Sequence, residues 1–397
     1  MSPPLRVAVL IDRLVVGGVE KVAIEQVRAL RQAGHDAHLL VLGRGGAGPG
    51  AFGKELDSVP VHTLADRVPR LLRGSAPVPG FSFLQTFHLT YPLFARWLLR
   101  EGEYDVILCH GSYTAFSAYA ISRVRHIPVV LFLWDPTFHI VTGPAYEGRA
   151  LGRLRALVAP VARHLDRWLV QRATRVLLGS SAFVEYVTRL SGVEPVVLTP
   201  SRDVPRHVPT WTSRPKRLLA VTAWKRGKNP EGLLDALERC PKDTSLTLAG
   251  AWLDDEMLQA FSAEVARRGL SARVEITGMV TEAELTDLYA DARLLIQSWE
   301  SPGFGLSALE AGACATPAVI PRGQGSADLL GPDAAALFDL GDNVGFVRLV
   351  DERLRDPVGS AAMGLRARDA VVEHASSRVV AARLEKALLE ASKSSGV

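Results

Sequence analysis

The sequence predicts an α/β protein with two parallel-sheet domains in series. Short apolar runs alternate with segments of helical periodicity from end to end, which is typical of parallel sheets covered by helices. The chain has 397 residues, which is long for one ordinary core and fits two domains of roughly 200 residues. A proline-rich polar stretch, 195–215, separates two α/β series. We expect an N-terminal domain over 1–200, a linker over 201–215, a second domain over 216–375 and a C-terminal helical segment over 376–397.

The first series begins with RVAVLID, 6–12, a run short enough to be a buried strand. Gly17 and Gly18 then open a segment whose apolar residues recur at helical spacing, and Gly34 is placed to end that helix. Residues 44–82 are rich in Gly, Pro and Arg, and we expect most of them to form loops. Further strands are expected over 37–43, 105–110, 128–134 and 175–181.

The second series repeats this alternation. Helices are expected over 229–240 and 305–314, and Thr281 with Glu284 forms a capping-box pattern that opens another. The last part of the chain is expected to be helical. Strands are expected over 217–224, 245–250, 273–278, 293–299 and 317–321.

Composition excludes several classes of protein. Hydrophobic residues make up 48% and charged residues 22%, which is normal for a globular enzyme. Cys109, Cys240 and Cys314 are widely spaced, which argues against a disulfide framework or a zinc site and fits a reducing compartment. Asp12 and Arg13 interrupt the first apolar run, so it is not a signal peptide, and no window reaches the ~18 apolar residues of a membrane span. We therefore expect a cytoplasmic protein. Its net charge of +4 permits an anionic partner without specifying one.

Two glycine-bearing loops stand directly before predicted helices, VVGGVEK at 15–21 and SPGFGLSALE at 301–310. Small residues let backbone N–H groups approach a phosphate, and the start of a helix adds a positive dipole. A simple strand-to-helix turn explains either loop equally well when it is taken alone. Neither loop has the dinucleotide-binding or the Walker A pattern, so both of those sites are disfavoured.

A cationic segment lies at the same predicted sheet edge as the second loop. Lys225, Arg226 and Lys228 follow the first strand of the second series, where α/β sheets bind ligands. Alone they indicate a solvated turn, but together with the glycine loop they can enclose a diphosphate. Glu310, in the helix after that loop, has apolar neighbours that indicate partial burial. Its carboxylate is either a dipole-stabilised surface charge or an acceptor for a ribose diol, and burial favours the second.

With these motifs, the chain resembles the GT-B-fold, retaining, nucleotide-sugar-dependent glycosyltransferases of family 4. The resemblance implies two Rossmann-like α/β/α domains that face each other across a cleft. It also implies that the C-terminal domain holds the nucleotide sugar, the N-terminal domain holds most of the acceptor, and the final helix, 376–393, crosses back to the N-terminal domain. The segments that carry it are GGVEKVAIEQVRALRQAGHDAHLLVL, KNPEGLLDAL, TGMVTEAELTDLYADARLLIQSWES and GFGLSALEAGACATPAVI.

The resemblance also implies a role for particular residues. Lys228 matches a lysine that binds the diphosphate, and Glu310 matches the second glutamate of a paired motif, which holds the ribose. Gly17 and Gly18 match a loop that approaches the donor phosphate, and Phe304 lies in the loop near the donor sugar. The donor-binding candidates are Gly17, Gly18, Lys225, Lys228, Glu300, Gly303, Phe304, Gly305, Leu306 and Glu310.

Three positions depart from the family pattern. Pro302 stands where the first glutamate is expected, and Glu300 lies two residues earlier. Trp134 replaces the histidine that ends the strand over 128–134, and Ala223 replaces a diphosphate-binding arginine.

Neighbouring side chains can take over these roles. Asp135, His139 and Lys225 are near the altered positions, and Asp135, His139 and Lys228 are the catalytic candidates. His110 ends another strand at the same edge and is, with Trp134, an acceptor-side candidate. A polar residue near a strand end is an equally good interpretation of His110.

The resemblance implies a retaining hexosyltransferase that uses a UDP- or GDP-sugar and a hydroxyl acceptor, in cell-envelope glycan, glycolipid or natural-product biosynthesis. Lys228, Lys225 and the loop N–H groups would stabilise the leaving nucleoside diphosphate. Its departing oxygen would take the acceptor's proton while the acceptor attacks from the same face. The chain has no clear D-x-D pair, so we expect neither a metal nor a cofactor besides the nucleotide sugar. The alternatives are a catalytically degenerate sugar-nucleotide-binding protein and a nucleotide-sugar epimerase on the same fold.

The acceptor is open between a glycan, a lipid-linked sugar and a small molecule. The arginine-rich segment 148–175 predicts one of two kinds of helix. It is either a basic amphipathic helix at the inner face of the plasma membrane or a solvated helix packed on its domain, and the second is favoured. Nucleic acid is disfavoured as a partner, because the basic residues lack an interleaved aromatic platform.

Overall fold

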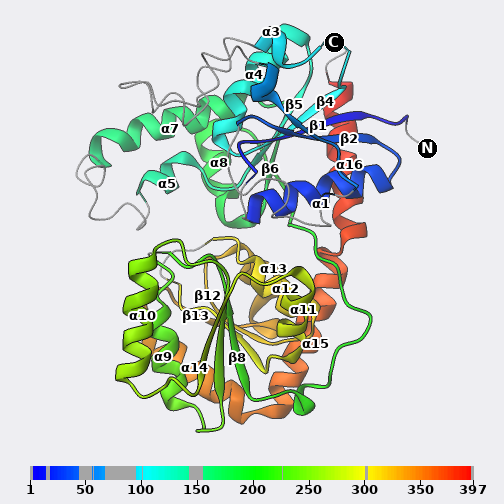
Figure 1. Ribbon diagram of the computed structural model, residues 1–397. Helices are drawn as coiled ribbons and strands as arrows, with labels where there is room; N and C mark the ends of the chain where they lie inside the picture. Colours follow the sequence, from blue (N-terminus) through cyan, green and yellow to red (C-terminus); the bar gives the residue numbers. More distant parts are fainter. Residues whose placement is uncertain are drawn as a thin grey trace. The chain divides into compact units, whose positions relative to one another are not determined.

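The computed structural model describes residues 3–14, 18–43, 56, 58–67, 95–100, 102–142, 155–225, 227–299 and 303–394 (Figure 1). These residues form two compact units. The described residues up to Ser201, together with those from Ser377 on, make the first unit, and Arg202–Ser376 make the second. Each unit has a parallel sheet with a hydrophobic cluster on each face. The predicted α/β class is therefore confirmed.

Within the described residues, the sheet of the first unit has seven strands in the order β3-β2-β1-β4-β5-β6-β7, paired in parallel. Five of them are the predicted strands, with bounds close to those expected. The strands are β1 Arg6–Ile11, β2 Asp36–Val41, β3 Val61–Thr63, β4 Val106–His110, β5 Val129–Leu133, β6 Arg175–Leu178 and β7 Val196–Val197. The α-helices are α1 Gly18–Gln32, α3 Ala95–Leu98, α4 Ser112–Arg125, α5 Thr137–Thr142, α7 Arg155–Arg172, α8 Val184–Ser191 and α16 Ser377–Lys393.

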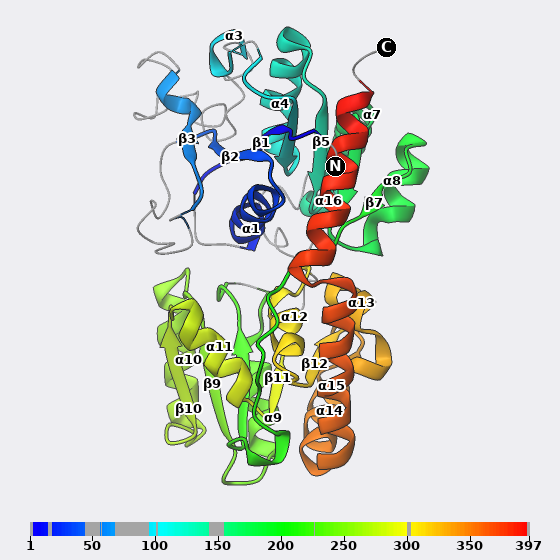
Figure 2. The same cartoon turned by 90° about the vertical axis from the view of Figure 1, so that its right-hand side faces the viewer.

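The strands of the first unit are buried on both faces. Leu10 of β1 packs in a cluster with residues of α4 and α7, and Val9 packs on the opposite face with residues of α1 and α16. α16 lies beside α1 (Figure 2), and it buries Val380, Leu384 and Leu388 in this second cluster. The end of the chain thus completes the core of the first unit.

The described sheet of the second unit has six parallel strands in the order β10-β9-β8-β11-β12-β13. Thr281 and Glu284 form the predicted capping box at the start of α11. The strands are β8 Arg217–Val221, β9 Ser245–Ala249, β10 Val274–Gly278, β11 Leu294–Ile296, β12 Ala318–Pro321 and β13 Ala336–Phe338. The α-helices are α9 Pro230–Arg239, α10 Asp255–Arg267, α11 Glu282–Asp291, α12 Leu306–Ala313, α13 Gly325–Ala334, α14 Asn343–Arg355 and α15 Pro357–His374.

The structure differs from the expectations in the stretch taken as a linker. Residues 202–215 belong to the second unit, where Trp211 is buried and its indole N–H donates to the Arg293 carbonyl at 2.7 Å. Arg214 is also buried and donates to the Cys314 carbonyl at 3.0 Å. In addition, α13 and the strands β3, β7 and β13 were not expected from the sequence. These three strands have only two or three residues, which is too short to show a periodic pattern.

Gly250, which follows β9, tests how closely the backbone after β9 packs on the backbone after β8. Its φ is +113°, and an added Cβ would press against the carbonyl oxygen of Thr222. We expect Gly250→Ala to lower the free energy of unfolding by several kcal/mol, since overpacking against backbone costs about 1–3 kcal/mol beyond the strain of a positive φ. Gly278→Ala is the matched control, because Gly278 has φ +66° but a Cβ added there meets no atom within 4 Å in the part of the chain that the structure describes. If urea titrations show the same loss of unfolding free energy for both variants, the close approach of Gly250 to the Thr222 carbonyl is contradicted.

Candidate active site

The order of strands in the second unit reverses between β8 and β11. From β8 the chain continues to β9 and β10 on one side, and from β11 it continues to β12 and β13 on the other. Ligands of open α/β sheets bind at the carboxyl ends of the strands at such a reversal. Lys225 and Lys228 follow β8, and Gly303–Gly305 lie between β11 and α12. The fold therefore brings the two predicted segments to one edge of one sheet.

Lys228 is held against the end of β11. Its Nζ lies 3.5 Å from the centroid of the Trp299 ring, which is a cation–π contact. The Ser298 hydroxyl donates to the carbonyl of Asn229 at 2.6 Å and ties the two loops together. Burial, with a smaller effect of the Lys225 charge, lowers the pKa of Lys228 to about 7. Lys228 is therefore an amine that gains or loses its proton near neutral pH.

The loop that carries Lys225 has an aromatic anchor. Trp224 is fully buried, stacks on Trp252 with 5.3 Å between ring centroids, and donates its indole N–H to the Ala249 carbonyl. Lys225 follows directly and is exposed. After Lys228, Asn229 caps α9 by accepting a hydrogen bond from the Gly232 N–H at 3.2 Å. Arg226 lies outside the described residues.

Gly305 is the N-cap of α12 and has a φ of 81°. A Cβ at this position would lie 2.5 Å from Ser326 Oγ and 2.7 Å from Gln324 Oε1. Only glycine fits both the dihedral angle and the space, so the start of α12 packs directly on Gln324 and Ser326. A Cβ placed on Gly303 would have no atom of the described residues beyond its chain neighbours within 4 Å.

Phe304 is partly buried against the hydrophobic cluster that contains Ala308 and Leu309 of α12. Leu306, the first residue of α12, is partly exposed. Glu300, Ser301 and Pro302 lie outside the described residues. The predicted role of Glu300 therefore stays a prediction.

A buried polar network supports this loop from below. The Gln297 side-chain amide donates to Ser307 Oγ at 2.6 Å, and the Gln324 amide donates to Gln297 Oε1 at 2.8 Å. The Ser326 N–H donates to the Phe304 carbonyl at 2.8 Å. Sequence reasoning missed these residues, because isolated glutamines and serines at strand and helix ends carry no pattern. They fix the backbone that precedes α12.

Glu310 is almost enclosed by two buried partners. The Tyr289 hydroxyl donates to its Oε2 at 2.6 Å, and Arg202 Nε lies 3.1 Å from its Oε1. Burial and the Glu310 charge raise the pKa of the Tyr289 phenol, which keeps it protonated as a donor. The sequence indicated partial burial of Glu310 but neither partner.

The acceptor-side candidates belong to the first unit. His110 is buried at the end of β4, and burial lowers its pKa to about 3, so its ring is neutral. Its Nε2 lies 3.0 Å from Gln26 Oε1, and its Nδ1 accepts from the Trp134 indole N–H at 3.3 Å. The proton of His110 is therefore on Nε2. Trp134 also stacks on Phe132 with 4.6 Å between ring centroids.

The candidates Asp135 and His139 lie in the segment after β5 and in α5. Asp135 is exposed just after β5. His139 lies in α5 with its ring 4.9 Å from Phe183 and 4.8 Å from Tyr186 between centroids, and burial lowers its pKa. Gly18 begins α1, whereas Gly17 lies outside the described residues.

The arginine-rich segment forms α7 from Arg155 on, and residues 148–154 are not described. Leu169 and Val170 are buried in the core of the first unit, so the apolar side of this helix packs on its own domain. The buried Asp166 accepts the Thr137 N–H at 2.7 Å. Arg163, Arg167 and Arg172 of this helix are exposed, and their contact with an anionic membrane stays a prediction. None of the described helices has the length and apolar character needed to cross a bilayer.

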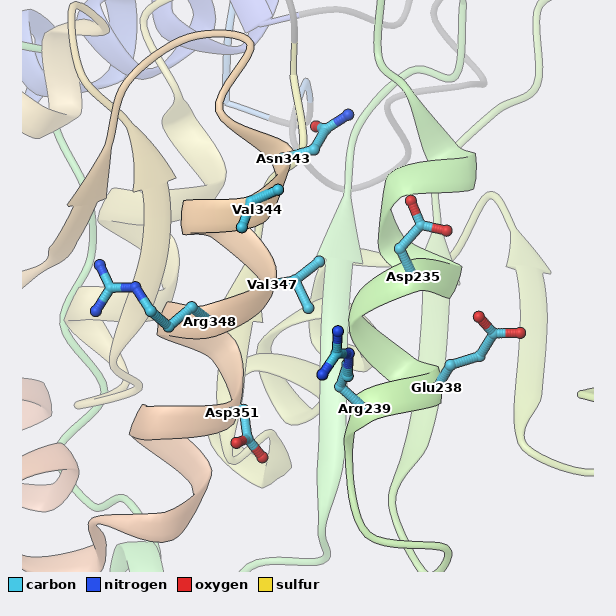
Figure 3. A pocket seen from close by; sticks show the side chains of 8 residues that line it. All are labelled: Asp235, Glu238, Arg239, Asn343, Val344, Val347, Arg348 and Asp351. Atoms are coloured by element: carbon cyan, nitrogen blue, oxygen red, sulfur yellow. The ribbon is translucent and has the colours of Figure 1, made fainter.

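A groove of about 710 Å³ runs between α9 and α14 (Figure 3). It carries none of the predicted site residues. Charged side chains of both signs border it, and one of them, Asp235, is paired with Arg268 at 2.6 Å. The groove is therefore a boundary between two solvated helix faces. Its lining is Asp235, Glu238, Arg239, Asn343, Val344, Val347, Arg348 and Asp351.

Both units of the chain match known glycosyltransferase domains. Residues 17–202 match the model of the glycosyl transferase 4-like domain, and residues 202–370 match that of glycosyl transferases group 1. The human (Homo sapiens) alpha-1,3/1,6-mannosyltransferase ALG2 is 22% identical over 389 residues, which cover 90% of this chain and 89% of the human protein.

Two solved structures share the fold over nearly the whole chain. Anabaena HepE, in complex with UDP and glucose, has a TM-score of 0.75 at 17% identity and covers 97% of this chain and 99% of its own. Sucrose-phosphate synthase from Thermosynechococcus elongatus also has a TM-score of 0.75, at 16% identity over 96% and 97%. The chain is therefore a transferase that belongs to the group 1 glycosyltransferases, and its two parallel-sheet units are those of the GT-B fold.

Proposed function

We propose that this transferase moves a hexosyl unit from a UDP- or GDP-sugar to a hydroxyl acceptor with retention of anomeric configuration. The observation that carries the proposal is the edge between β8 and β11. The segments that follow these two neighbouring strands carry the Lys228 amine, which lies on the Trp299 ring, and the glycine-capped start of α12. The complex of Anabaena HepE with UDP and glucose supports a nucleotide-sugar donor for this fold.

Lys228 and α12 offer a diphosphate two different kinds of stabilisation. Lys228 supplies a proton and a positive charge, and the first N–H groups of α12 supply fixed dipoles. Because the Lys228 amine has a pKa of about 7, an incoming diphosphate favours its protonated form. Negative charge that develops on the leaving diphosphate is stabilised by the same groups. Lys225, exposed on the same loop, adds a second cation.

The other end of the donor would bind Glu310. A carboxylate can accept one hydrogen bond from each hydroxyl of a ribose diol. Phe304 and Leu306 would then border the sugar and phosphates. This assignment rests on the family resemblance of the segment 303–310 together with the partial exposure of the Glu310 side chain, 13%.

The proposed transfer needs neither a metal nor a cofactor besides the nucleotide sugar. The glycosidic bond to the leaving phosphate breaks while the acceptor oxygen bonds to the same face of the anomeric carbon. The acceptor's proton moves to the departing phosphate oxygen, so no carboxylate nucleophile is required. Trp134, fixed by His110, is proposed to contact the acceptor, and Asp135 and His139 stay candidates for acid–base roles.

Nucleotide binding is the first test. We expect UDP or GDP to raise the stability of the wild-type protein by about 2.7 kcal/mol at one hundred times its Kd, measured by thermal shift. Glu310→Ala should weaken that affinity about tenfold or more, because a hydrogen bond to a charged group is lost. Glu256→Ala, an exposed glutamate on α10, is the control. Absence of any shift with both nucleotides would reject the proposed donor.

The pH dependence of nucleotide binding tests Lys228. Above a pH of about 7 the free amine is neutral, so binding must take up a proton and the affinity should fall by up to about tenfold per pH unit. Lys228→Arg keeps its charge and should flatten this dependence between pH 7 and 9. Calorimetry in buffers of different ionisation enthalpy measures the proton directly. An unchanged slope in the arginine variant would show that another group titrates.

Product stereochemistry tests the mechanism. We expect proton NMR of the early product to show the anomeric configuration of the donor, and we expect transfer to continue in EDTA. An inverted product would exclude same-face attack. Activity that EDTA abolishes and Mg²⁺ restores would exclude metal independence. Nucleotide-sugar binding without transfer or hydrolysis would favour a binding protein, and donor conversion without an acceptor would favour an epimerase.

A further inference from the structure

Arg202 is a buried arginine whose side chain contacts the candidate ribose-binding carboxylate. It is 4% exposed, and its Nε lies 3.1 Å from Glu310 Oε1. Burying a guanidinium is costly unless an opposite charge accompanies it. The backbone of Arg202 is also fixed, since its N–H donates to the Ala375 carbonyl at 2.8 Å. Glu310 therefore has a cation that is anchored independently of any ligand.

Tyr289 fixes the second oxygen of the same carboxylate. Its side chain is 2% exposed, and its hydroxyl donates to Glu310 Oε2 at 2.6 Å. One carboxylate oxygen thus accepts a hydrogen bond from Tyr289, and the other forms an ion pair with Arg202. An ionised carboxylate oxygen has two lone pairs, so it can accept a hydrogen bond from a ligand beside one from the protein.

Glu310 also needs an external source of positive charge. It is the fifth residue of α12, past the first turn, where the helix dipole has largely decayed. Arg202 supplies that charge from the segment that precedes β8. A carboxylate that only balanced a buried arginine would need no route to solvent, yet Glu310 keeps 13% exposure.

We propose that Arg202 and Tyr289 are positioning residues that hold the Glu310 carboxylate ionised and oriented for both hydroxyls of the donor's ribose. This rests on the proposed function, in which Glu310 binds the ribose. In the opposite arrangement, Arg202 would compete with the ribose for the Glu310 carboxylate, and its removal would make the ribonucleotide bind more tightly.

The test compares the Kd of the ribonucleoside diphosphate, UDP or GDP, with that of its 2′,3′-dideoxy analogue by calorimetry. The ratio of the two Kd values isolates the ribose hydroxyls. We expect the wild-type protein to prefer the ribonucleotide by about tenfold or more, since charge-assisted hydrogen bonds are lost in the analogue. Glu310→Ala should bring the ratio close to one.

Arg202→Met and Tyr289→Phe should each lower this ratio several-fold and leave the Kd of the dideoxy analogue unchanged. Arg202→Lys keeps the charge and should retain part of the preference. If Arg202→Met does not fold, Tyr289→Phe and Arg202→Lys decide the question in the same way.

Arg214→Met is the matched control. Arg214 is a buried arginine of the same unit, 3% exposed, that donates to backbone carbonyls and to the Thr316 hydroxyl. Its loss should lower stability without changing the ribose ratio. A merely structural role of Arg202 would give the same pattern as Arg214.

The positioning role is supported if Arg202→Met and Tyr289→Phe lower the ratio of the two Kd values, Arg202→Lys retains part of it, and Arg214→Met leaves it at the wild-type value. An Arg202→Met ratio equal to wild type, or tighter ribonucleotide binding in that variant, overturns it. If the wild-type protein binds UDP or GDP with no ribose preference, this inference is overturned, but the proposal of a nucleotide-sugar donor stands. Binding of neither nucleotide rejects the proposed function, and this inference with it.

Discussion

The parallel pairing of β8 with β11 is the contact on which the candidate site depends. Leu218 pairs with Leu294 and Leu219 with Leu295, so two strands that are not consecutive become neighbours. Because both strands are parallel, their carboxyl ends point to the same edge. The loop with Lys228 and the loop with Gly305 therefore begin next to each other. Their proximity follows from backbone hydrogen bonding and the burial of four leucines, not from contacts between the loops alone.

Burial determines the chemistry of the polar groups at these edges. It lowers the pKa of Lys228 to about 7 and that of His110 to about 3, through the same cost of holding charge away from water. The consequences differ because the partners differ. His110 has both ring nitrogens in hydrogen bonds and becomes a fixed neutral support for Trp134. The Nζ of Lys228 lies on the Trp299 ring face, which favours the cationic form, so the amine stays responsive to an anion.

The sequence was sufficient for features that local patterns encode. Apolar runs predicted the long strands, and the capping box placed the start of α11. Side-chain partnerships were not predictable, because they join segments that only the fold brings together. Arg202 lies in a proline-rich stretch that suggested a linker, and nothing near it in the sequence points to Glu310. The same holds for Gln297 and Gln324 beneath the glycine loop.

The two ends of the proposed donor meet opposite electrostatic situations. Among the described residues, no carboxylate forms an ion pair with Lys228, so a bound diphosphate would supply the missing negative charge and gain strongly from it. Glu310 is already compensated by Arg202 and Tyr289, so a ribose would add hydrogen bonds to a charge that is satisfied. Affinity should therefore come mainly from the diphosphate end. The ribose end contributes geometry, which selects among ligands that all carry a diphosphate.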